Sequence, residues 1–247
     1  MSNPFVQRLE TLSRLQDADV QTLEELCKSP RDIGAKQYVF RESSGSAWFP
    51  VIISGWAARH QILRNGGRQI TRLMLPGDAY YFDAPPDSAL REEVVTLSAC
   101  RFVLIAHAGI ESAIKASSPI GEAMRNYGRM ENSILSSMVV SIGRRDAFER
   151  MAYLICELHF RLGAIEGAIQ DDAFDFPLTQ DDFADVLGLT PVHVNRKLQQ
   201  LRQSGIISLR SKRMQIHDLA QLRRIAGFGS AYLTQGRVLA DRSPAPA

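Results

Sequence analysis

The stretch 178–209, LTQDDFADVLGLTPVHVNRKLQQLRQSGIISL, restricts the fold more than any other part of the sequence. Thr179 can cap a first short helix, because its hydroxyl can accept a hydrogen bond from a backbone N–H of the first turn. Gly188 follows that helix where a turn needs a positive φ, which glycine adopts at little cost. Thr190 can cap a second helix, and Pro191 suits its first position, where a missing N–H is tolerated. The stretch therefore predicts two helices joined by a tight turn and followed by a strand.

The second helix of this pair is predicted to have one apolar and one polar face. Val194, Leu198 and Leu201 recur at helical spacing and are expected to point inward. The opposite face carries Val192, Arg196, Gln199, Gln200 and Gln203, with His193 and Asn195 beside it. A helix of this kind fits the major groove of DNA. An ordinary amphipathic helix has the same pattern, and it is the capped pair with its central glycine that favours a DNA-binding helix–turn–helix.

Positive charge gathers in the same part of the chain. The net charge of the whole sequence is only +2, but Asp218 is the only acid between residues 196 and 224. The basic residues of that span are Arg196, Lys197, Arg202, Arg210, Lys212, Arg213, Arg223 and Arg224. A local basic patch suits a polyanionic partner such as double-stranded DNA, although a solvated basic face would have the same composition.

The sequence favours a cytoplasmic protein without a membrane partner. The first residues, MSNPFVQRLETL, lack the apolar core of a secretory signal, and no run reaches the ~18 apolar residues of a membrane span. The three cysteines, Cys27, Cys100 and Cys156, are isolated among apolar neighbours. They predict buried free thiols and not a zinc or iron–sulfur site, so we expect neither a metal nor a cofactor.

The N-terminal half combines a helical start with a β-rich segment. Residues 5–27 contain an amphipathic helix with Asp17 as a candidate cap. After Ala35, short apolar and polar alternations are broken by Gly, Pro and Ser, which predicts a small β-roll or barrel. Asn65 and Gly66 predict a hairpin with a type I′ turn, in which both residues have a positive φ. The candidate strands are Gln37–Phe40, Trp48–Ile53, Ala57–Leu63, Gln69–Met74 and Val94–Ile105.

A long helix is predicted to start at Pro119 and to carry a coiled-coil-like seam. The spacing of four and three residues that marks such a seam is set by Ile120, Met124, Tyr127, Ile134 and Met138. We expect this helix to join two copies of the chain, because it is longer than a small roll needs for its own cover. Packing on its own β-roll is the alternative. The segment 143–146 interrupts the pattern and is a candidate hinge before a new helix over 147–162.

The chain as a whole is predicted to be an α+β protein in four parts. Strands at 206–209 and 214–217, joined by a basic tip, would make the helix–turn–helix a winged one. The predicted parts are a β-roll (jelly roll) with its N-terminal helix over residues 1–118, a dimerisation helix and hinge over 119–145, a winged helix–turn–helix over 146–227, and a partly disordered tail over 228–247.

This order of parts resembles the cyclic-AMP receptor protein/fumarate-nitrate regulator (Crp/Fnr) superfamily. The resemblance covers about residues 12–219 and is most specific in LTQDDFADVLGLTPVHVNRKLQQLRQSGII, with Arg196 at the family's conserved-type arginine. The segment LPGDAYYF, residues 75–82, is similar to the glycine–aspartate turn of the family's β-roll, which has a cyclic-nucleotide-binding-like fold. The resemblance implies a homodimeric bacterial transcription regulator that binds a two-fold DNA operator, and RNA polymerase as a further partner if it is an activator.

The sequence departs from the family at the effector site. Cyclic-nucleotide members carry a Gly-Glu pair and then an Arg-Ser pair for the cyclic phosphate, but here Arg91 is followed by two glutamates. The cysteine cluster of the oxygen-sensing branch is also missing. We therefore expect a regulator that cyclic AMP does not control and whose effector is unknown; the alternative is a cyclic-nucleotide-responsive regulator or binding module. A candidate effector pocket, or else an ordinary aromatic core, is formed by Tyr80, Tyr81, Phe82, Arg91 and Tyr127.

The resemblance assigns roles to residues of the winged helix–turn–helix. Arg196 is expected to donate two hydrogen bonds to guanine O6 and N7. Val192 stands where the family often has an acid, and we expect it to contact a thymine methyl instead. Candidate contacts to bases or phosphates are Thr179, Gln180, Thr190, Pro191, His193, Asn195 and Gln199, and at the tip of the wing Lys212 and Arg213.

An enzyme built on a small β-barrel of the cupin type is the rival from another class. Such an enzyme needs clustered His and Glu ligands on neighbouring strands. The roll offers His60 and, at its end, His107, which are far apart and lack ligand spacing. We therefore expect that the protein is not an enzyme.

Overall fold

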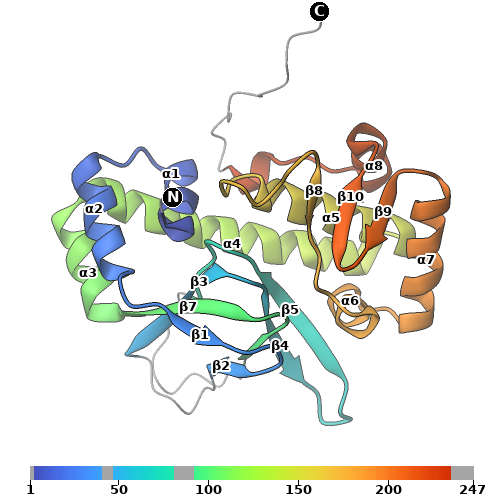
Figure 1. The fold of residues 1–247 in the computed structure, drawn as a ribbon, viewed down its shortest axis with the longest axis horizontal. Helices are drawn as coiled ribbons and strands as arrows, with labels where there is room; N and C mark the ends of the chain where they lie inside the picture. The colour runs from blue at the N-terminus through green and yellow to red at the C-terminus, as the bar shows by residue number, and fades with distance from the viewer. Residues whose placement is uncertain (1–2, 41–46, 81–91, 235–247) are drawn as a thin grey trace, which may run out of the picture.

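The computed structural model describes residues 3–40, 47–80 and 92–234 and has the α+β architecture expected from the sequence. A β-roll lies beneath one long helix, α4 (Ser118–Arg144), which crosses the whole molecule (Figure 1). Short helices close one end of the roll, and a C-terminal module of helices with a small sheet lies at the other end.

Two helices, and not one, precede the roll. In α1 (Pro4–Leu12) the side chain of Asn3 accepts a hydrogen bond from the backbone N–H of Phe5. In α2 (Asp17–Leu26) the cap is Gln16, whose backbone N–H donates to Asp19 at 2.8 Å. The expected cap Asp17 is thus the first helical residue, where its charge suits the positive end of the helix dipole.

The described part of the roll contains two antiparallel sheets. One has the order β1 (Arg31–Ile33), β7 (Cys100–Ala106), β3 (Trp48–Ser54), and the other has the order β2 (Tyr38–Phe40), β6 (Glu93–Thr96), β4 (Ala57–Ile62), β5 (Arg68–Met74). The single strand expected over 94–105 is therefore two strands that belong to different sheets. The chain changes sheet between Thr96 and Cys100, next to Gly55, which has a φ of 81°.

The hairpin between β4 and β5 does not have the predicted type I′ turn. Within this loop only Gly66 has a positive φ (83°), and Asn65 does not adopt a left-handed backbone conformation. The N–H of Gly66 donates to the carbonyl of Leu63, and the N–H of Leu63 donates to the carbonyl of Gly67. This is the pattern of a type I turn followed by one left-handed glycine, the usual three-residue hairpin loop. The side chain of Asn65 accepts from the N–H of Gly67 at 3.0 Å, which stabilises that loop.

The long helix α4 buries the residues that were expected to face a second copy. The exposed fractions of Ile120, Met124, Tyr127 and Ile134 are 1%, 5%, 1% and 4%, and all four belong to the core formed with α1, the roll and α3 (His107–Ala116). The predicted seam is therefore wrong at these four positions, because the roll and the N-terminal helices of the same chain cover that face. Met138, the last of the seam, is half-buried at the junction with the C-terminal module.

The C-terminal module begins with α5 (Ala147–Leu162), capped by Asp146, whose side chain accepts from the N–H groups of Phe148 and Glu149. It continues with β8 (Ala173–Asp175), α6 (Gln180–Leu187), α7 (Pro191–Gln203), β9 (Ile207–Arg210), β10 (Arg213–Ile216) and α8 (Leu219–Ala226). The segment between α5 and α6 thus contains a strand, and the wing sheet has three strands in the order β8-β10-β9. Phe174 makes β8 part of the core, since its side chain is completely buried.

The tail expected from residue 228 starts with a packed segment. Phe228 makes an edge contact with Tyr153 of α5, and a short 3-10 helix, η2 (Ala231–Leu233), returns to the long helix. Leu233 is 3% exposed and joins the same core as α1 and α4. The C-terminal module is therefore attached to the N-terminal half by more than the α4–α5 connection.

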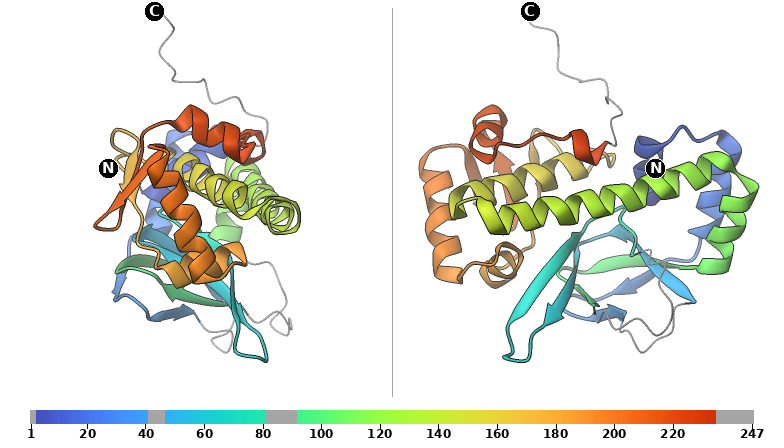
Figure 2. Two further views of the ribbon diagram at one scale, coloured as in Figure 1. Left: turned by 90° about the vertical axis from the view of Figure 1, so that its right-hand side faces the viewer. Right: turned by 180° about the vertical axis from the view of Figure 1, so that it is seen from behind.

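Side chains of the N-terminal and C-terminal halves meet in a shared hydrophobic cluster. Trp56, just before β4, and Phe176, just after β8, are 6.0 Å apart between ring centroids, in an edge-to-face arrangement. Seen from behind, α4 lies in front of the other elements along its length, so one of its faces is turned away from the rest of the chain (Figure 2).

Among the helices of residues 3–40, 47–80 and 92–234, none has both the length and the apolar character of a membrane-spanning segment.

Candidate nucleic-acid interface

The first helix of the pair, α6, is fixed at its start by a reciprocal capping box. The hydroxyl of Thr179 accepts from the backbone N–H of Asp182 at 3.1 Å, and the carboxylate of Asp182 accepts from the backbone N–H of Thr179 at 3.1 Å. The Thr179 hydroxyl also donates to that carboxylate at 2.6 Å. Thr179 and Gln180 are both exposed at this helix end, as a contact to phosphate requires.

The second helix, α7, has the two faces that the sequence predicts. Gly188 ends α6 with a φ of 63°, and the hydroxyl of Thr190 accepts from the N–H of His193 at 3.3 Å to cap α7. Pro191 occupies the first position of α7. The buried face consists of Val194, Leu198 and Leu201, and the exposed residues include Val192, His193, Arg196, Gln199, Gln200 and Gln203, with Asn195 half-buried between the two faces.

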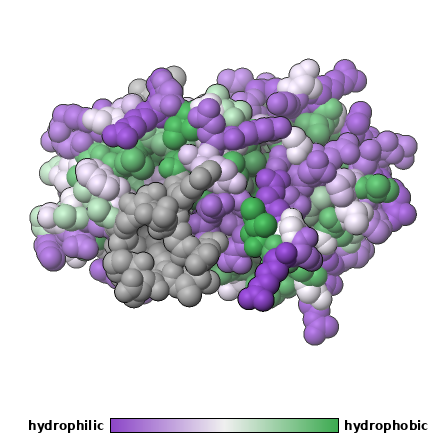
Figure 3. All heavy atoms as spheres, turned by 90° about the horizontal axis from the view of Figure 1, so that it is seen from below, coloured by the Kyte–Doolittle hydropathy of each residue, from purple (hydrophilic) through white to green (hydrophobic). Residues whose placement is uncertain are grey.

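Val192 is the most exposed large hydrophobic residue given for the described chain, at 80%. It lies in the first turn of α7, on the side opposite to the buried Val194 and Leu198. On the right of Figure 3, over the helix–turn–helix, the surface is mostly hydrophilic, and hydrophobic residues are scattered and not joined into one patch. The exposed neighbours of Val192 on α7 include His193 and Arg196. An isolated exposed valine among polar side chains suits one methyl-sized contact on a partner.

The wing presents basic side chains at a tight turn. Ser211 and Lys212 connect β9 to β10 with φ values of 48° and 59°, so the turn has the left-handed backbone of type I′ without a glycine. Lys212 is exposed, and its carbonyl accepts from the N–H of Phe176 at 2.7 Å, which ties the turn to β8. Arg213 is exposed too, but its guanidinium lies 3.4 Å from the carboxylate of Asp175. Arg213 therefore has a carboxylate close by, whereas Lys212 is exposed at the tip of the wing.

A contact that the sequence analysis missed attaches α6 to the β-roll. Arg68, at the start of β5, donates from Nη2 to Asp182 Oδ1 and from Nε to Asp185 Oδ2, both at 2.6 Å. The side-chain amide of Gln69 donates to the backbone carbonyl of Asp185 at 2.6 Å. Burial raises the pKa of Asp182, but the hydrogen bonds from Thr179 and Arg68 outweigh burial, so its pKa is lower than that of an ordinary aspartate.

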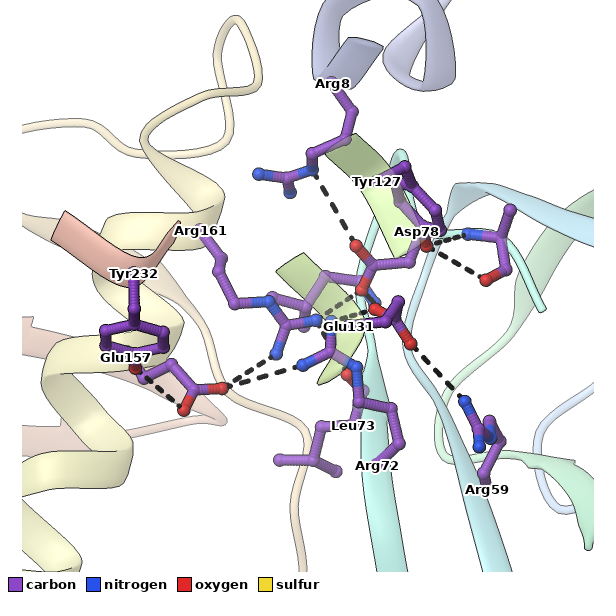
Figure 4. A network of polar contacts seen from close by, with 12 residues as sticks. Arg8, Arg59, Arg72, Leu73, Asp78, Tyr127, Glu131, Glu157, Arg161 and Tyr232 are labelled. Atoms are coloured by element: carbon purple, nitrogen blue, oxygen red, sulfur yellow. Dashed lines mark hydrogen bonds and ion pairs between the residues drawn. The ribbon is translucent and has the colours of Figure 1, made fainter. Parts of the chain in front are cut away.

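A buried network of charged side chains lies between the roll, α4 and α5 (Figure 4). Asp78, from the glycine–aspartate turn after β5, pairs with Arg161 of α5 and lies 3.8 Å from Nε of Arg8. Arg161 also donates to Glu157 at 3.2 Å and to the carbonyl of Leu73 at 2.8 Å. Burial raises the pKa of Asp78, but the positive charges of Arg161, Arg72 and Arg8 outweigh it, so the pKa lies below its usual range. The network orients the C-terminal module relative to the roll.

Tyr127 belongs to this junction and not to a dimer seam. Its hydroxyl donates to the carbonyl of Ala79 at 2.9 Å and accepts from the N–H of Ala79 at 2.7 Å. Its exposed fraction is 1%, so the predicted role of Tyr127 in a dimer seam is wrong, because its ring and hydroxyl hold α4 to the roll. Its role in an effector pocket stays a prediction. Tyr80 is 8% exposed and lies beneath the guanidinium of Arg59, with 4.4 Å to the ring centroid. The other predicted pocket residues, Tyr81, Phe82 and Arg91, lie outside the described residues.

The residues considered for metal or redox chemistry are separated in space. Within the part of the chain that the structure describes, no three His, Cys, Asp or Glu side chains form a group suited to a metal ion. Cys27, Cys100 and Cys156 are buried free thiols, as predicted. Burial raises the pKa of Cys27 and of Cys156 to about 12, so both remain protonated at neutral pH.

Comparison with known proteins gives matches to both parts of the chain. Residues 149–225 match the model of the Crp-like helix–turn–helix domain. The transcriptional activator protein FnrL of Cereibacter sphaeroides is 26% identical over 221 residues, which cover 88% of each chain. The nitrogen fixation regulation protein FixK of Azorhizobium caulinodans is 28% identical over 176 residues, covering 71% of this chain and 70% of FixK.

Solved structures show the same fold. FixK2 from Bradyrhizobium japonicum superposes with a TM-score of 0.70 at 20% identity, covering 81% of this chain and 98% of FixK2. TTHB099, a transcriptional regulator of the CRP family from Thermus thermophilus, superposes with a TM-score of 0.61 at 18% identity, covering 81% of this chain and 97% of its own.

Proposed function

The chain belongs to the Crp/Fnr superfamily of DNA-binding transcription regulators, and from this premise we propose that it acts as a homodimer that reads a two-fold operator with α7. The observation that carries the proposal is the division of α7 into a face that is buried in the module and an exposed face with Arg196 and Gln199. The major groove of B-DNA accepts one helix with such a face.

Specificity in this proposal comes from the N-terminal half of α7. Arg196 is exposed and donates bidentate hydrogen bonds to guanine O6 and N7, the commonest specific contact of an arginine with DNA. Val192 contacts a thymine methyl, since a valine offers an apolar surface and no hydrogen bond. Thr179, Gln180 and Thr190 lie at the starts of α6 and α7, where backbone N–H groups and hydroxyls suit phosphate oxygens.

The dimer of this proposal forms through the outer face of α4, not through the residues first predicted. Leu135, Val139 and Ile142 are 50%, 64% and 40% exposed, although a large apolar residue on a helix is usually covered. Their spacing of four and three residues continues backwards to Asn132 and Gly128, which are also exposed. A second copy packed along this outer stripe would cover it and would place two copies of α7 about a two-fold axis.

The proposed binding to DNA also suggests where the protein acts and which further partner it has. We place it in the cytoplasm, where bacterial DNA is accessible, and we propose RNA polymerase as a further partner if the protein activates transcription. We also propose, from the sequence around Arg91, that cyclic AMP is not its effector.

Selection from a pool of random duplex DNA tests the proposal. The full-length protein should enrich a sequence with two-fold symmetry whose half-site centres lie about one helical turn, ~10–10.5 base pairs, apart. Enrichment of an asymmetric single site would contradict the dimeric arrangement. Retention of the pool without enrichment of any sequence would contradict sequence-specific binding.

A further inference from the structure

A small cavity lies at the junction of the roll, the long helix and the helix–turn–helix. Its volume is about 40 Å³, and its walls come from β5, the C-terminal half of α4, α5 and the end of α6. The apolar part of the wall includes Leu73, Ile134, Met138, Leu154 and Leu187. The roll, the long helix and the helix–turn–helix therefore all contribute side chains to this one cavity.

Positive charge dominates the polar part of the wall. Among the described residues, the charged ones that line the cavity are Arg72 from β5, Arg150 and Arg161 from α5, and one acid, Glu157. Arg72 and Arg161 are 6% and 1% exposed, so water screens their charges little. A buried group of cations favours an anionic ligand.

Arg150 is the cation of this group that the fold compensates least. Glu131 and Asp78 lie outside the cavity wall and pair with Arg72 and Arg161, respectively. Arg150 instead donates to the backbone carbonyls of Leu187, Ile142 and Arg145. The charge of Asp146 acts on it, but no carboxylate of the described chain forms an ion pair with it. The positive charge of Arg150 is therefore available to a bound anion.

The guanidiniums of the wall also have donors to spare. Nε and Nη1 of Arg72, Nε of Arg150 and Nε of Arg161 are buried and have no hydrogen-bond partner among the residues that the structure describes. Figure 4 shows Arg72 and Arg161 both directed toward Glu157, but Nη1 of Arg72 remains 3.8 Å from its Oε1, too far for a hydrogen bond. A buried donor without an acceptor is destabilising, and a ligand that supplies acceptor oxygens would remove that cost.

We propose that this cavity binds a short-chain carboxylate of about the size of acetate or propionate. The carboxylate accepts hydrogen bonds from the arginine donors, since guanidinium and carboxylate match in planar, charge-assisted geometry. The short alkyl part packs against Leu73, Met138 and Leu154. The space of about 40 Å³ between these walls suits a ligand of this small size.

Binding here would stabilise one arrangement of the DNA-reading module. The ligand would contact β5 of the roll, α4 in its C-terminal half and the end of α6 together, close to the α4–α5 break at Arg145. A ligand that binds this arrangement more tightly than any other shifts the population toward it. The site differs from the predicted pocket, because neither Tyr80 nor Tyr127, the two described residues of that prediction, lines this cavity.

The test uses the full-length protein labelled with ¹³C at the methionine methyl groups and titrated with sodium acetate at constant pH and ionic strength. The methyl signal of Met138, assigned with Met138→Leu, should shift saturably, while those of Met130 and Met214, which lie elsewhere in the core, should not. Acetamide, which has the shape of acetate without its charge, should give at least tenfold weaker binding. No DNA is needed, so failure here is separate from failure of the proposed DNA-binding function.

Two variants and a control complete the experiment. Leu154→Phe fills the cavity and should abolish the saturable shift, and Arg150→Gln removes one cation and should weaken binding at least tenfold. Arg144→Gln removes an exposed arginine that does not line the cavity and should leave binding unchanged. If Leu154→Phe does not fold, as judged by the other methionine signals, Arg150→Gln decides. The proposal is overturned if no saturable shift occurs or if acetamide binds as well as acetate. It is also overturned if the saturable shift persists in folded Leu154→Phe, or if Arg150→Gln binds acetate as tightly as the wild type.

Discussion

Arg68 on the β-roll holds Asp182 at the start of the first DNA-binding helix, with 2.6 Å between Nη2 and Oδ1. The same arginine reaches Asp185 one turn later at 2.6 Å, so a single guanidinium joins the roll to two positions of α6. Since α6 packs directly on α7, the orientation of the reading helix relative to the roll depends on this contact.

Replacement of Arg68 should loosen that attachment. Arg68→Gln removes two charge-assisted hydrogen bonds from partly exposed partners, and we expect the free energy of unfolding to fall by about 1–3 kcal/mol. Urea denaturation followed by circular dichroism measures the change. Arg64→Gln, at the exposed hairpin tip, is the matched control and should change stability little. Equal stability of wild type and Arg68→Gln would show that the contact does not stabilise the fold.

Asp182 should make stability depend on acidic pH. Its pKa in the folded protein is depressed, so the unfolded chain takes up a proton at higher pH than the folded protein does. The stabilisation is complete above the ordinary aspartate pKa of about 3.9 and is lost as the pH falls through the lower, folded-state value. Asp182→Asn should therefore be less stable at pH 7 and lose less stability than wild type between pH 5 and pH 3. Asp181→Asn, an exposed neighbour, should retain the wild-type pH profile.

Removal of Arg196 should reduce both DNA affinity and base preference. Loss of a bidentate contact with guanine costs about 1–3 kcal/mol, or roughly 5- to 150-fold in affinity for the selected operator. Gel-shift titrations of Arg196→Ala against operators with each base at the contacted position measure both effects. Lys115→Ala removes one positive charge on α3 and controls for net charge. Wild-type affinity and unchanged base preference in Arg196→Ala would contradict the assignment.

The two basic residues of the wing should differ in their contribution. Lys212→Ala should reduce the slope of log affinity against log salt by about 0.9, the value for one phosphate contact on B-DNA. Arg213→Ala should have a smaller effect, because its guanidinium already has Asp175 as a partner at 3.4 Å. Fluorescence anisotropy over a series of salt concentrations gives both slopes. A larger change for Arg213→Ala than for Lys212→Ala would reverse the proposed order.

Substitutions on the two faces of α4 should have separable effects. Val139→Glu places like charges at the two-fold axis of the proposed dimer, and sedimentation velocity should show a monomer at concentrations where the wild type is dimeric. Ile120→Ala removes buried apolar volume and should lower the free energy of unfolding by about 2–5 kcal/mol without changing the dimer of the folded protein. A dimer that persists in Val139→Glu would exclude the outer stripe as the interface.

The helix–turn–helix could be predicted from the sequence because its determinants are local. The caps at Thr179 and Thr190, the left-handed Gly188 and the proline at the first position of α7 act within a few residues along the chain. The same holds for the inward stripe of Val194, Leu198 and Leu201, since helical periodicity alone sets it. At Asn65 and Gly66, the local sequence is compatible with a type I′ turn and with a type I turn followed by a left-handed glycine. The sequence therefore predicted the hairpin but not its type of turn.

The tertiary structure decided which surfaces meet. Helix α4 carries two apolar stripes, and only the packing of the roll and of α1 on the face with Met124 and Tyr127 leaves Leu135 and Val139 exposed for a partner. Arg68 and Asp182 are more than a hundred residues apart, so no local pattern connects them. Sequence periodicity therefore determined the elements and their faces, while the partner of each face depended on long-range packing, in which burial of apolar surface outweighs any local preference.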